Sequence, residues 1–106
     1  MPKRTLPAKE IDLALLIFIE RYASSLSKWD ILVFFGQHPD KSHTAAEVAI
    51  RLGRSLRSIR PELGELALHH VLERNTPRTE PTYRLTRRRP MRTLVIKFAG
   101  HNHRPD

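Results

Sequence analysis

The first part of the chain contains one long apolar stretch. Residues 11–19 are almost continuously apolar, and Pro7 suits the first turn of a helix, so this pattern predicts a helix over residues 7–23. Such a helix would be apolar on most of its sides, and a chain of 106 residues can hardly cover all of them alone. We therefore expect residues 7–23 to form a dimerisation helix.

The next two helices are indicated by their start and stop signals. Ser27 resembles a helix N-cap and Gly36 resembles a stop, so a second helix is expected between them. Thr44 and Glu47 have the spacing of a capping box, in which each side chain bonds the backbone of the other residue. A third helix should begin there and end at Gly53, because glycine suits the left-handed conformation after a helix.

Only Gly53 and Arg54 separate this third helix from Ser55, which is the next N-cap signal. Two helices that meet across so short a turn are typical of a helix-turn-helix motif. Pro61 lies inside the following helix and is expected to bend it. Residues at alternating steps of three and four form a seam that should face the core: Leu56, Ile59, Leu63, Leu66 and His70.

The last third of the chain predicts a hairpin and a closing helix. Residues 71–75 and 82–86 have the composition of strands, and prolines in the loop between them would prevent edge pairing. Residues 90–99 fit a strand or a helix, and their apolar spacing, with proline first and glycine after, favours a helix. Residues 100–106 form a tail that we expect to be disordered from His101 onward.

These elements predict a mainly α protein with a small β-hairpin. The expected architecture is a single domain over residues 1–106. Its three-helical core and hairpin occupy residues 27–86, and one further helix is added at each end.

Charge is distributed unevenly along this architecture. Residues 1–50 contain six basic and six acidic side chains, whereas residues 51–97 contain twelve basic and four acidic ones. Eleven of those twelve basic residues are arginine, whose planar guanidinium group suits phosphate and guanine. A localised positive field of this kind indicates a polyanionic partner, and a basic surface that serves only solubility is the simpler alternative.

Composition also restricts the compartment. The chain has no cysteine, so neither disulfides nor a thiolate zinc site are available, and the reducing cytoplasm is the expected location. Its longest apolar run covers residues 13–19, far short of the roughly 20 residues that span a bilayer. We therefore expect neither a transmembrane helix nor a secretory signal.

No combination of residues indicates catalysis or a bound cofactor. The sequence shows no nucleophile with a matching base, no paired carboxylate site and no phosphate loop, so an enzyme is not expected. His69 with His70 and His101 with His103 are the candidate metal ligands. Adjacent helical residues point about 100° apart and the tail pair lacks further ligands, so no metal site is expected.

The ordered set of elements resembles a known family over residues 27–99. The segments that carry the resemblance are residues 44–49, 52–55, Leu63, Leu66, 71–74 and 83–86. In this order they resemble the winged helix-turn-helix transcriptional regulators, the MarR-like and ArsR-like group. Similar domains often have glycine where this chain has His70, and histidine tolerates the left-handed conformation better than most residues. The resemblance implies double-stranded DNA as partner, transcriptional control and a homodimer, and it leaves a small-molecule effector undetermined.

In this motif the second helix enters the major groove by its N-terminal part, and a basic wing contacts the flanking backbone or the minor groove. Glu62, Glu65 and Glu73 are expected in the C-terminal half, away from DNA, which would repel them. The expected DNA-binding residues are Thr44, Arg54, Ser55, Arg57, Ser58, Arg60, Arg78, Arg84, Arg87, Arg88 and Arg89. The expected dimer contacts are Ile11, Leu15, Phe18, Ile19, Leu94 and Phe98.

Two other functions fit the same pattern. A winged helix can serve protein assembly as a subunit or adaptor, in which case its binding to nucleic acid would be weak and independent of sequence. RNA binding by the basic face is a third alternative. It is disfavoured because the sequence offers no set of aromatic residues exposed on a strand.

Overall fold

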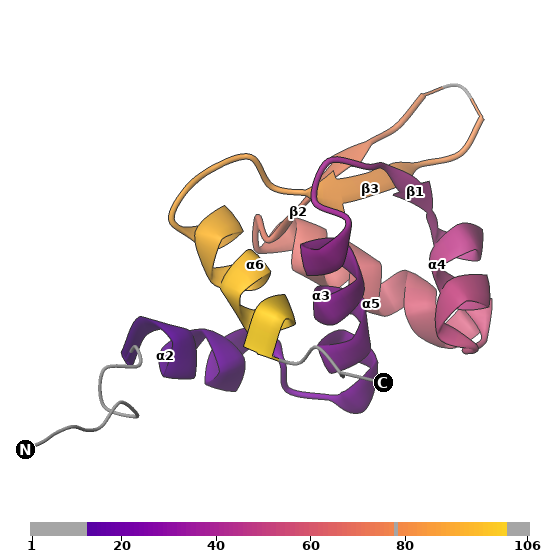
Figure 1. Cartoon of the computed structure of the whole chain (residues 1–106). Coiled ribbons are helices and arrows are strands. Elements are labelled where there is room, and N and C mark those ends of the chain that lie inside the picture. Colours follow the sequence, from indigo (N-terminus) through magenta and orange to yellow (C-terminus); the bar gives the residue numbers. More distant parts are fainter. Residues whose placement is uncertain (1–12, 78, 102–106) are drawn as a thin grey trace, which may run out of the picture.

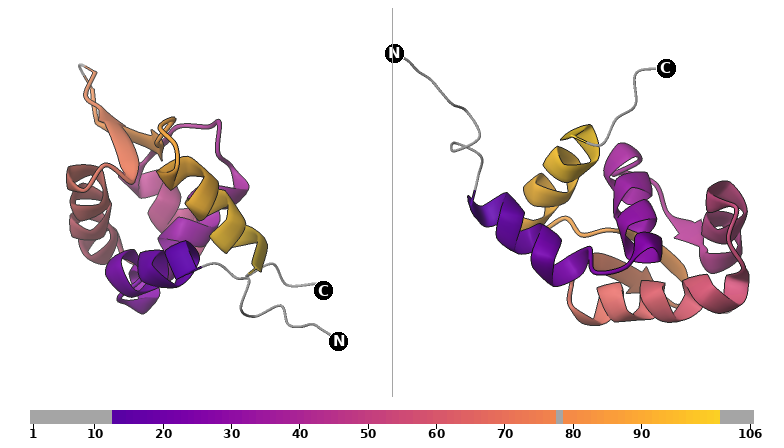
Figure 2. Two further views of the ribbon diagram at one scale, coloured as in Figure 1. Left: turned by 90° about the vertical axis from the view of Figure 1, so that its left-hand side faces the viewer. Right: turned by 90° about the horizontal axis from the view of Figure 1, so that it is seen from below.

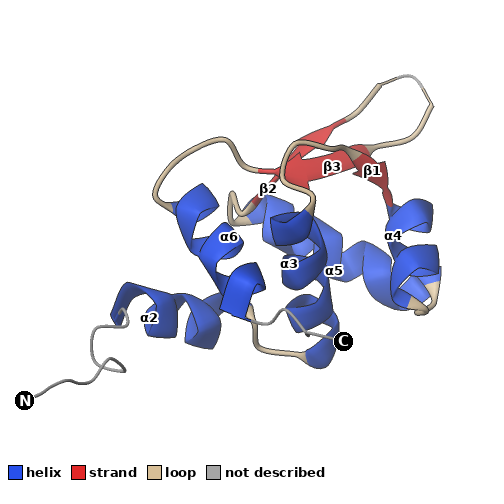
Figure 3. Ribbon diagram, in the orientation of Figure 1, coloured by secondary structure: helices blue, strands red, loops and turns tan. Residues whose placement is uncertain are grey.

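Within the part of the chain that the structure describes, two helices, one short strand, two further helices, a hairpin and a last helix follow one another (Figure 1). The computed structural model describes residues 13–77 and 79–101. Its elements are α2 (Leu13–Tyr22), α3 (Leu26–Gln37), β1 (His43–Thr44), α4 (Ala45–Leu52), α5 (Leu56–Leu68), β2 (Leu72–Asn75), β3 (Thr82–Leu85) and α6 (Met91–His101). The predominance of helix beside one small antiparallel sheet confirms the predicted fold class (Figure 3).

The sheet contains the predicted hairpin and one additional strand. Its order is β1–β3–β2, and both pairs of neighbours are antiparallel. β2 and β3 form the hairpin, which we call the wing, and Arg74 lies opposite Tyr83 in it. β1 pairs His43 with Tyr83 on the other edge of β3. The sequence does not predict β1, because a strand of two residues has no periodicity of its own and only its pairing defines it.

α4 begins and ends at the predicted signals, and α5, the second helix of the helix-turn-helix unit, begins at its own. Thr44 and Glu47 form both hydrogen bonds of the capping box, and Gly53 adopts the left-handed conformation with a φ of 66°. The Ser55 hydroxyl oxygen accepts a hydrogen bond from the backbone N–H of Ser58 and caps α5. These signals are confirmed, and each is satisfied within a few residues of sequence.

The buried face of α5 confirms most of the predicted seam. Ile59, Leu63 and Leu66 are buried, and Pro61 lies inside the helix. His70 is the exception, because α5 ends before it and its side chain is exposed in the turn that leads to β2. That turn places His70 in the left-handed conformation, with a φ of 63°.

α3 differs from its prediction at both ends. Its N-cap is Ser25, whose hydroxyl oxygen accepts a hydrogen bond from the backbone N–H of Lys28, and the helix continues one residue beyond Gly36. Gly36 therefore does not stop the helix. A Cβ atom at this position would lie 2.5 Å from the Ala99 Cβ and 2.7 Å from the Val95 carbonyl oxygen. The glycine thus allows α3 and α6 to pack closely against each other.

α2 packs on the rest of the molecule with one face only. Leu15 and Phe18 are buried, and the centre of the Phe18 ring lies 5.7 Å from that of Phe98 on α6. The large apolar side chains that α2 exposes are Leu13, Leu16 and Ile17, which are 70%, 56% and 51% exposed.

The expected dimer contacts require a correction. Leu15, Phe18 and Phe98 are covered by their own chain, because α2 packs against α6, so these three side chains are not available to a partner. Ile19 and Leu94 are partly buried and pack against the same core. The apolar side chains of α2 therefore fall into two groups. Some are buried against the rest of the chain, and the others are exposed to solvent.

Both predicted terminal segments extend beyond the described residues. Ile11 and the other residues of 7–12 lie outside them. At the other end α6 extends through Gly100 to His101, so these two residues are helical and not part of a tail. Residues 102–106 lie outside the described part of the chain.

Candidate nucleic-acid interface

The N-terminal half of α5 presents two arginines to solvent. Arg57 and Arg60 are exposed, whereas Ile59 between them is buried, as the helical spacing predicts. Within residues 13–77 and 79–101, neither guanidinium group has an ion-pair partner. Ser55 and Ser58 are also exposed, but their hydroxyl groups bond each other, with a distance of 3.2 Å between the Oγ atoms. The two arginines are therefore the groups of this surface that can bind an external anion.

A hollow of about 360 Å³ lies between α5 and the wing. α5 contributes Arg60 to it, and β2 contributes Arg74, whose guanidinium carbon lies 6.0 Å from the centre of the Tyr83 ring. Helix and wing thus bring one arginine each to the same hollow, and the wing extends away from the helical body (Figures 1 and 2). The residues that line it are Ala45, Arg60, Gly64, Arg74, Glu80, Pro81 and Tyr83.

Glu73 forms ion pairs with two arginines at the base of the wing, Arg84 and Arg87. Its carboxylate lies 3.3 Å from the Arg87 guanidinium and 3.6 Å from that of Arg84, and it accepts a 2.8 Å hydrogen bond from the backbone N–H of Arg87. Burial acts to raise the pKa of Glu73, but the hydrogen bonds from Arg87 and the charges of both arginines lower it overall. Glu73 lies on β2, within the strand predicted over residues 71–75, and its ion pairs with Arg84 and Arg87 partly neutralise the wing.

The other arginines predicted for the wing have different surroundings. Arg88 and Arg89 are exposed between β3 and α6, and the backbone N–H of Arg88 donates a hydrogen bond to the Thr86 hydroxyl. Neither of their guanidinium groups is ion-paired within the described part of the chain. Arg78 lies outside the described residues.

Two of the predicted DNA contacts are engaged in holding the motif together. Two nitrogens of the Arg54 guanidinium, Nε and Nη2, lie 3.1 Å and 2.7 Å from the same carboxylate oxygen of Asp30 on α3. The Thr44 hydroxyl is engaged in the capping box of α4. Sequence spacing reveals the capping role of Thr44, because Glu47 is only three positions away. It does not reveal the pair of Arg54 with Asp30, because these residues are 24 positions apart.

The second half of α5 is acidic and is compensated by α3. The Lys28 ammonium nitrogen lies 2.8 Å from the Glu65 carboxylate and 3.6 Å from that of Glu62. The hydrogen bond to Glu65 raises the pKa of Lys28 despite its burial, and the same bond lowers the pKa of Glu65. α5 therefore changes along its length from an exposed cationic half to a paired acidic half.

Arg74 belongs to this surface and was not expected there. Side chains alternate between the two faces of a strand, so residues 71–75 offered a signal for its orientation. The sequence does not give the register of the two strands of the wing. In the observed register Arg74 pairs with Tyr83, and Arg74 therefore lies beside the hollow that Arg60 also lines.

Comparison with known proteins identifies the fold. No protein-family model matches the chain, and no curated protein matches it. Among solved structures the chain is similar to HlyU from Vibrio cholerae N16961, with a TM-score of 0.62 and 15% sequence identity. The match covers 81% of this chain and 89% of the HlyU chain. This chain has a winged-helix fold, as its sequence predicts.

The described part of the chain contains no candidate membrane span and no candidate metal cluster. Over residues 13–77 and 79–101, no helix has both the length and the apolar character needed to cross a membrane. In the same ranges no three histidine or acidic side chains are grouped so that they could hold a metal ion. His69 instead lies beside Tyr22, with 6.1 Å between the ring centres.

Proposed function

We propose that the chain is a transcriptional regulator that binds double-stranded DNA in a sequence-specific manner. The observation that carries this proposal is the exposure of Arg57 and Arg60 on α5 without an ion-pair partner in the described part of the chain. Arg60 also faces the wing across the hollow that Arg74 lines. In helix-turn-helix domains the N-terminal part of this helix enters the major groove, so the charged half of α5 is the half that such docking requires.

The N-terminal half of α5 and the wing would then make different contacts with DNA. An arginine in the major groove can form two hydrogen bonds with guanine, which contributes about 1–3 kcal/mol to discrimination between bases. Ser55 and Ser58 would lie at the same end of the helix. The basic residues of the wing region would bind flanking phosphates or the minor groove: Arg74, Arg78, Arg84, Arg87, Arg88 and Arg89.

We further propose that two copies bind DNA together. Leu13, Leu16 and Ile17 on α2 form an exposed apolar face that a second copy would cover. Two recognition helices would then lie about 34 Å apart on a site with approximate two-fold symmetry. Sedimentation at micromolar concentration tests this arrangement: a dimer supports it, and a monomer in the presence and absence of DNA contradicts it.

Selection of bound duplexes from a random pool tests the main proposal. The expected result is an enriched motif with two related half-sites one helical turn apart. The measurement should be repeated with competitor RNA, which should displace the labelled duplex only weakly. A pool that remains unenriched, together with equal affinity for all duplexes, contradicts sequence-specific binding.

The alternative function is that of a protein-interaction subunit or adaptor. The exposed apolar face of α2 favours it, because such a face suits a different protein as well as a second copy. This alternative predicts weak binding to DNA, without sequence preference, by a chain that is monomeric on its own. The sedimentation and selection experiments therefore separate the two functions.

A further inference from the structure

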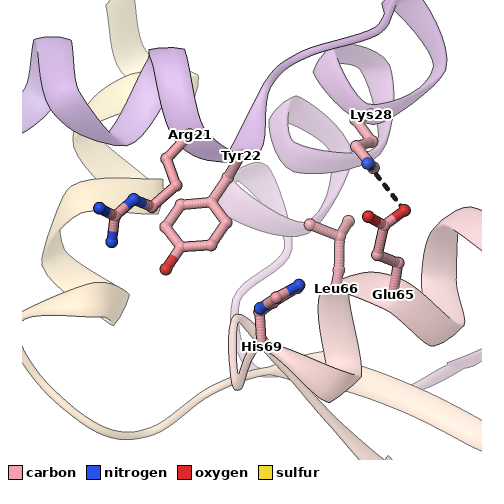
Figure 4. Close-up of a pocket in the computed structure, with 6 residues that line it drawn as sticks. All are labelled: Arg21, Tyr22, Lys28, Glu65, Leu66 and His69. Atoms are coloured by element: carbon pink, nitrogen blue, oxygen red, sulfur yellow. Dashed lines mark ion pairs between the residues drawn. The ribbon is translucent and has the colours of Figure 1, made fainter.

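His43 lies where the wing, α3 and α4 meet. It is the first residue of β1 and pairs with Tyr83 of β3. Its ring packs against Phe34 and Phe35 of α3, with 4.8 Å and 5.9 Å between the ring centres, and its side chain is only 12% exposed. His69 differs, because it is exposed and lines a hollow of about 330 Å³ near the second half of α5 (Figure 4). A change of charge at His43 would therefore act inside the packed structure.

The two ring nitrogens of His43 have different surroundings. Nδ1 lies 3.8 Å from the Oε1 atom of Glu47 on α4. That oxygen already accepts a 2.9 Å hydrogen bond from the backbone N–H of Thr44, as part of the capping box. Nε2 is buried and has no hydrogen-bond partner in the described part of the chain. Because a neutral imidazole carries a proton on one nitrogen only, the neutral ring can leave Nε2 without a proton, whereas the protonated ring makes it a buried donor without an acceptor.

The environment of the ring opposes its protonation. Burial lowers the pKa of His43 from its ordinary value of 6.5, and the neighbouring basic groups lower this pKa further. Glu47 acts in the opposite direction, but its side chain is 59% exposed, so solvent screens its charge. The titratable and charged groups around the ring come from α3, the loop before β1, α4 and β3, and they are His38, Lys41, Glu47, Arg51 and Tyr83.

β1 joins the wing to the helix-turn-helix unit. It has only two residues, and the second of them, Thr44, is also the N-cap of α4. On its other side Tyr83, the partner of His43, lines the hollow that Arg60 of α5 and Arg74 of the wing also line. Separation of β1 from β3 would therefore remove one support of the wing and loosen the position of Arg74 relative to Arg60.

We propose that His43 is a positioning residue, which holds the wing against α4 while its ring is neutral and loosens the wing when the ring is protonated. Above pH 6.5 the ring is neutral in the packed and the released states, so the packing of β1 contributes its full stability. As the pH falls from 6.5 through the lower pKa of the packed ring, the released state binds a proton more readily, and this stability is lost.

The consequence for DNA binding rests on the proposed function. A loosened wing contributes less to the complex, so the affinity for a selected duplex should fall in acid. Protonation of the exposed histidines acts in the opposite direction, because added positive charge strengthens binding to DNA. The expected fall is therefore opposite in sign to the effect of surface charge alone.

An NMR titration of the full chain tests the release of the wing. The His43 ring should titrate below pH 6.5, and the amide signals of residues 43–44 and of their partners 82–83 should titrate with the same midpoint. The ring of His69 serves as the reference for an exposed histidine. A His43 ring that titrates at or above pH 6.5, or amide signals of β1 and β3 that stay constant through its titration, would overturn the proposal.

Substitution of His43 tests the same role in DNA binding. Between about pH 7.5 and pH 5.5, at constant salt, the affinity of the wild type for the selected duplex should fall by roughly fivefold or more. His43→Phe keeps an aromatic ring beside Phe34 and Phe35 and cannot be protonated, so this fall should disappear. His43→Gln is a second variant without titration, in case the phenylalanine perturbs the packing. His69→Gln is the matched control and should keep the fall, because it changes an exposed histidine.

The outcomes separate this inference from the proposed function. A fall in affinity that persists in both His43→Phe and His43→Gln contradicts the role of His43. A wing that loosens in the NMR titration while the affinity for DNA stays constant contradicts the control of DNA binding by His43. A chain that binds no duplex at pH 7.5 contradicts the proposed function, and the NMR titration still decides whether His43 holds the wing.

Discussion

The first half of α5 and the base of the wing are both rich in arginine, but they differ in how these arginines are paired. Arg57 and Arg60 on α5 have no ion-pair partner in the described part of the chain. Arg84 and Arg87 share the carboxylate of Glu73, at 3.6 Å and 3.3 Å. The number of arginines in a segment therefore does not measure the positive charge that the folded protein offers to a ligand.

This difference assigns different contributions to the two regions. Exposed ion pairs contribute only about 0–1 kcal/mol, so a phosphate can replace Glu73 as the partner of the wing arginines at little cost. The net gain from each such exchange is small and does not depend on base sequence. Arg57 and Arg60 on α5 do not have to break an ion pair within the described part of the chain before they bind DNA. Their planar guanidinium groups can also form selective contacts with bases. In the DNA complex proposed above, selectivity should therefore come from α5 and general affinity from the wing.

The largest effect is expected from the double substitution Arg57→Ala with Arg60→Ala. Each lost bidentate contact should cost about 1–3 kcal/mol, or roughly five- to 150-fold, on the selected duplex, with a much smaller loss on a scrambled duplex. Fluorescence anisotropy with both duplexes measures the difference. Equal losses on the two duplexes would remove the distinction between α5 and the wing.

A change in the body of the protein provides a control for both regions. In Gly36→Ala the new Cβ would meet the Ala99 Cβ at 2.5 Å, so α3 and α6 must separate. We expect a loss of about 1–3 kcal/mol in the free energy of unfolding, measured by urea titration, with unchanged sequence preference. Gly100→Ala on α6 is the matched control, because a Cβ atom there would meet no other described part of the chain, apart from its own helix, within 4 Å. Wild-type stability of Gly36→Ala would refute the close packing.

Glu73→Gln should leave the wing arginines Arg84 and Arg87 without this ion-pair partner, as Arg57 and Arg60 on α5 are. The substitution removes the carboxylate that pairs Arg84 and Arg87, so affinity should rise a few-fold on selected and scrambled duplexes alike. Because more positive charge becomes available, the dependence of affinity on salt concentration should also become steeper. An affinity that falls on both duplexes would show that Glu73 positions these arginines for DNA more than it competes with DNA.

The same residue has a predicted effect on stability in acid. The pKa of Glu73 is lowered from 4.5 in the folded protein, so the carboxylate stabilises the fold above that value. This stabilisation is lost as the pH falls through the lower folded pKa. Urea titrations between roughly pH 6 and pH 3 should show a smaller acid loss for Glu73→Gln than for the wild type. Parallel curves would contradict the contribution of this carboxylate.

The smallest effect is expected from Arg88→Ala. Arg88 is exposed and unpaired in the described part of the chain, but it lies after β3 and not on α5. Its removal should weaken binding to all duplexes equally and reduce the salt slope by about 1, as the loss of one phosphate contact does. A change in the enriched motif after this substitution would place Arg88 among the residues that read bases.

The local signals of the helix-turn-helix unit could be predicted from sequence because their partners lie within a few residues. Thr44 and Glu47 are three positions apart, and Gly53 and His70 adopt the left-handed conformation that their residue types tolerate. The closing helix was also predictable, because its apolar spacing repeats over ten residues. The exposure of Arg57 and Arg60 followed from helical spacing alone.

The contacts that could not be predicted join distant positions. The Arg54 pair with Asp30 spans 24 positions, and the Arg92 hydrogen bond to the Pro39 carbonyl spans 53. Gly36 shows the same limit, because its role depends on Ala99 of a helix that lies far along the chain. No pattern within a segment carries this information.

The amino-acid sequence by itself determined where α4 begins and ends, where α5 begins, and that a cationic half of α5 faces solvent, because capping and periodicity act over one or two turns. Only the tertiary structure decided which arginines are neutralised, which apolar side of α2 is covered and where the hollows lie. Charge pairing and burial depend on distances in space, and these are set when segments far apart in the sequence pack together.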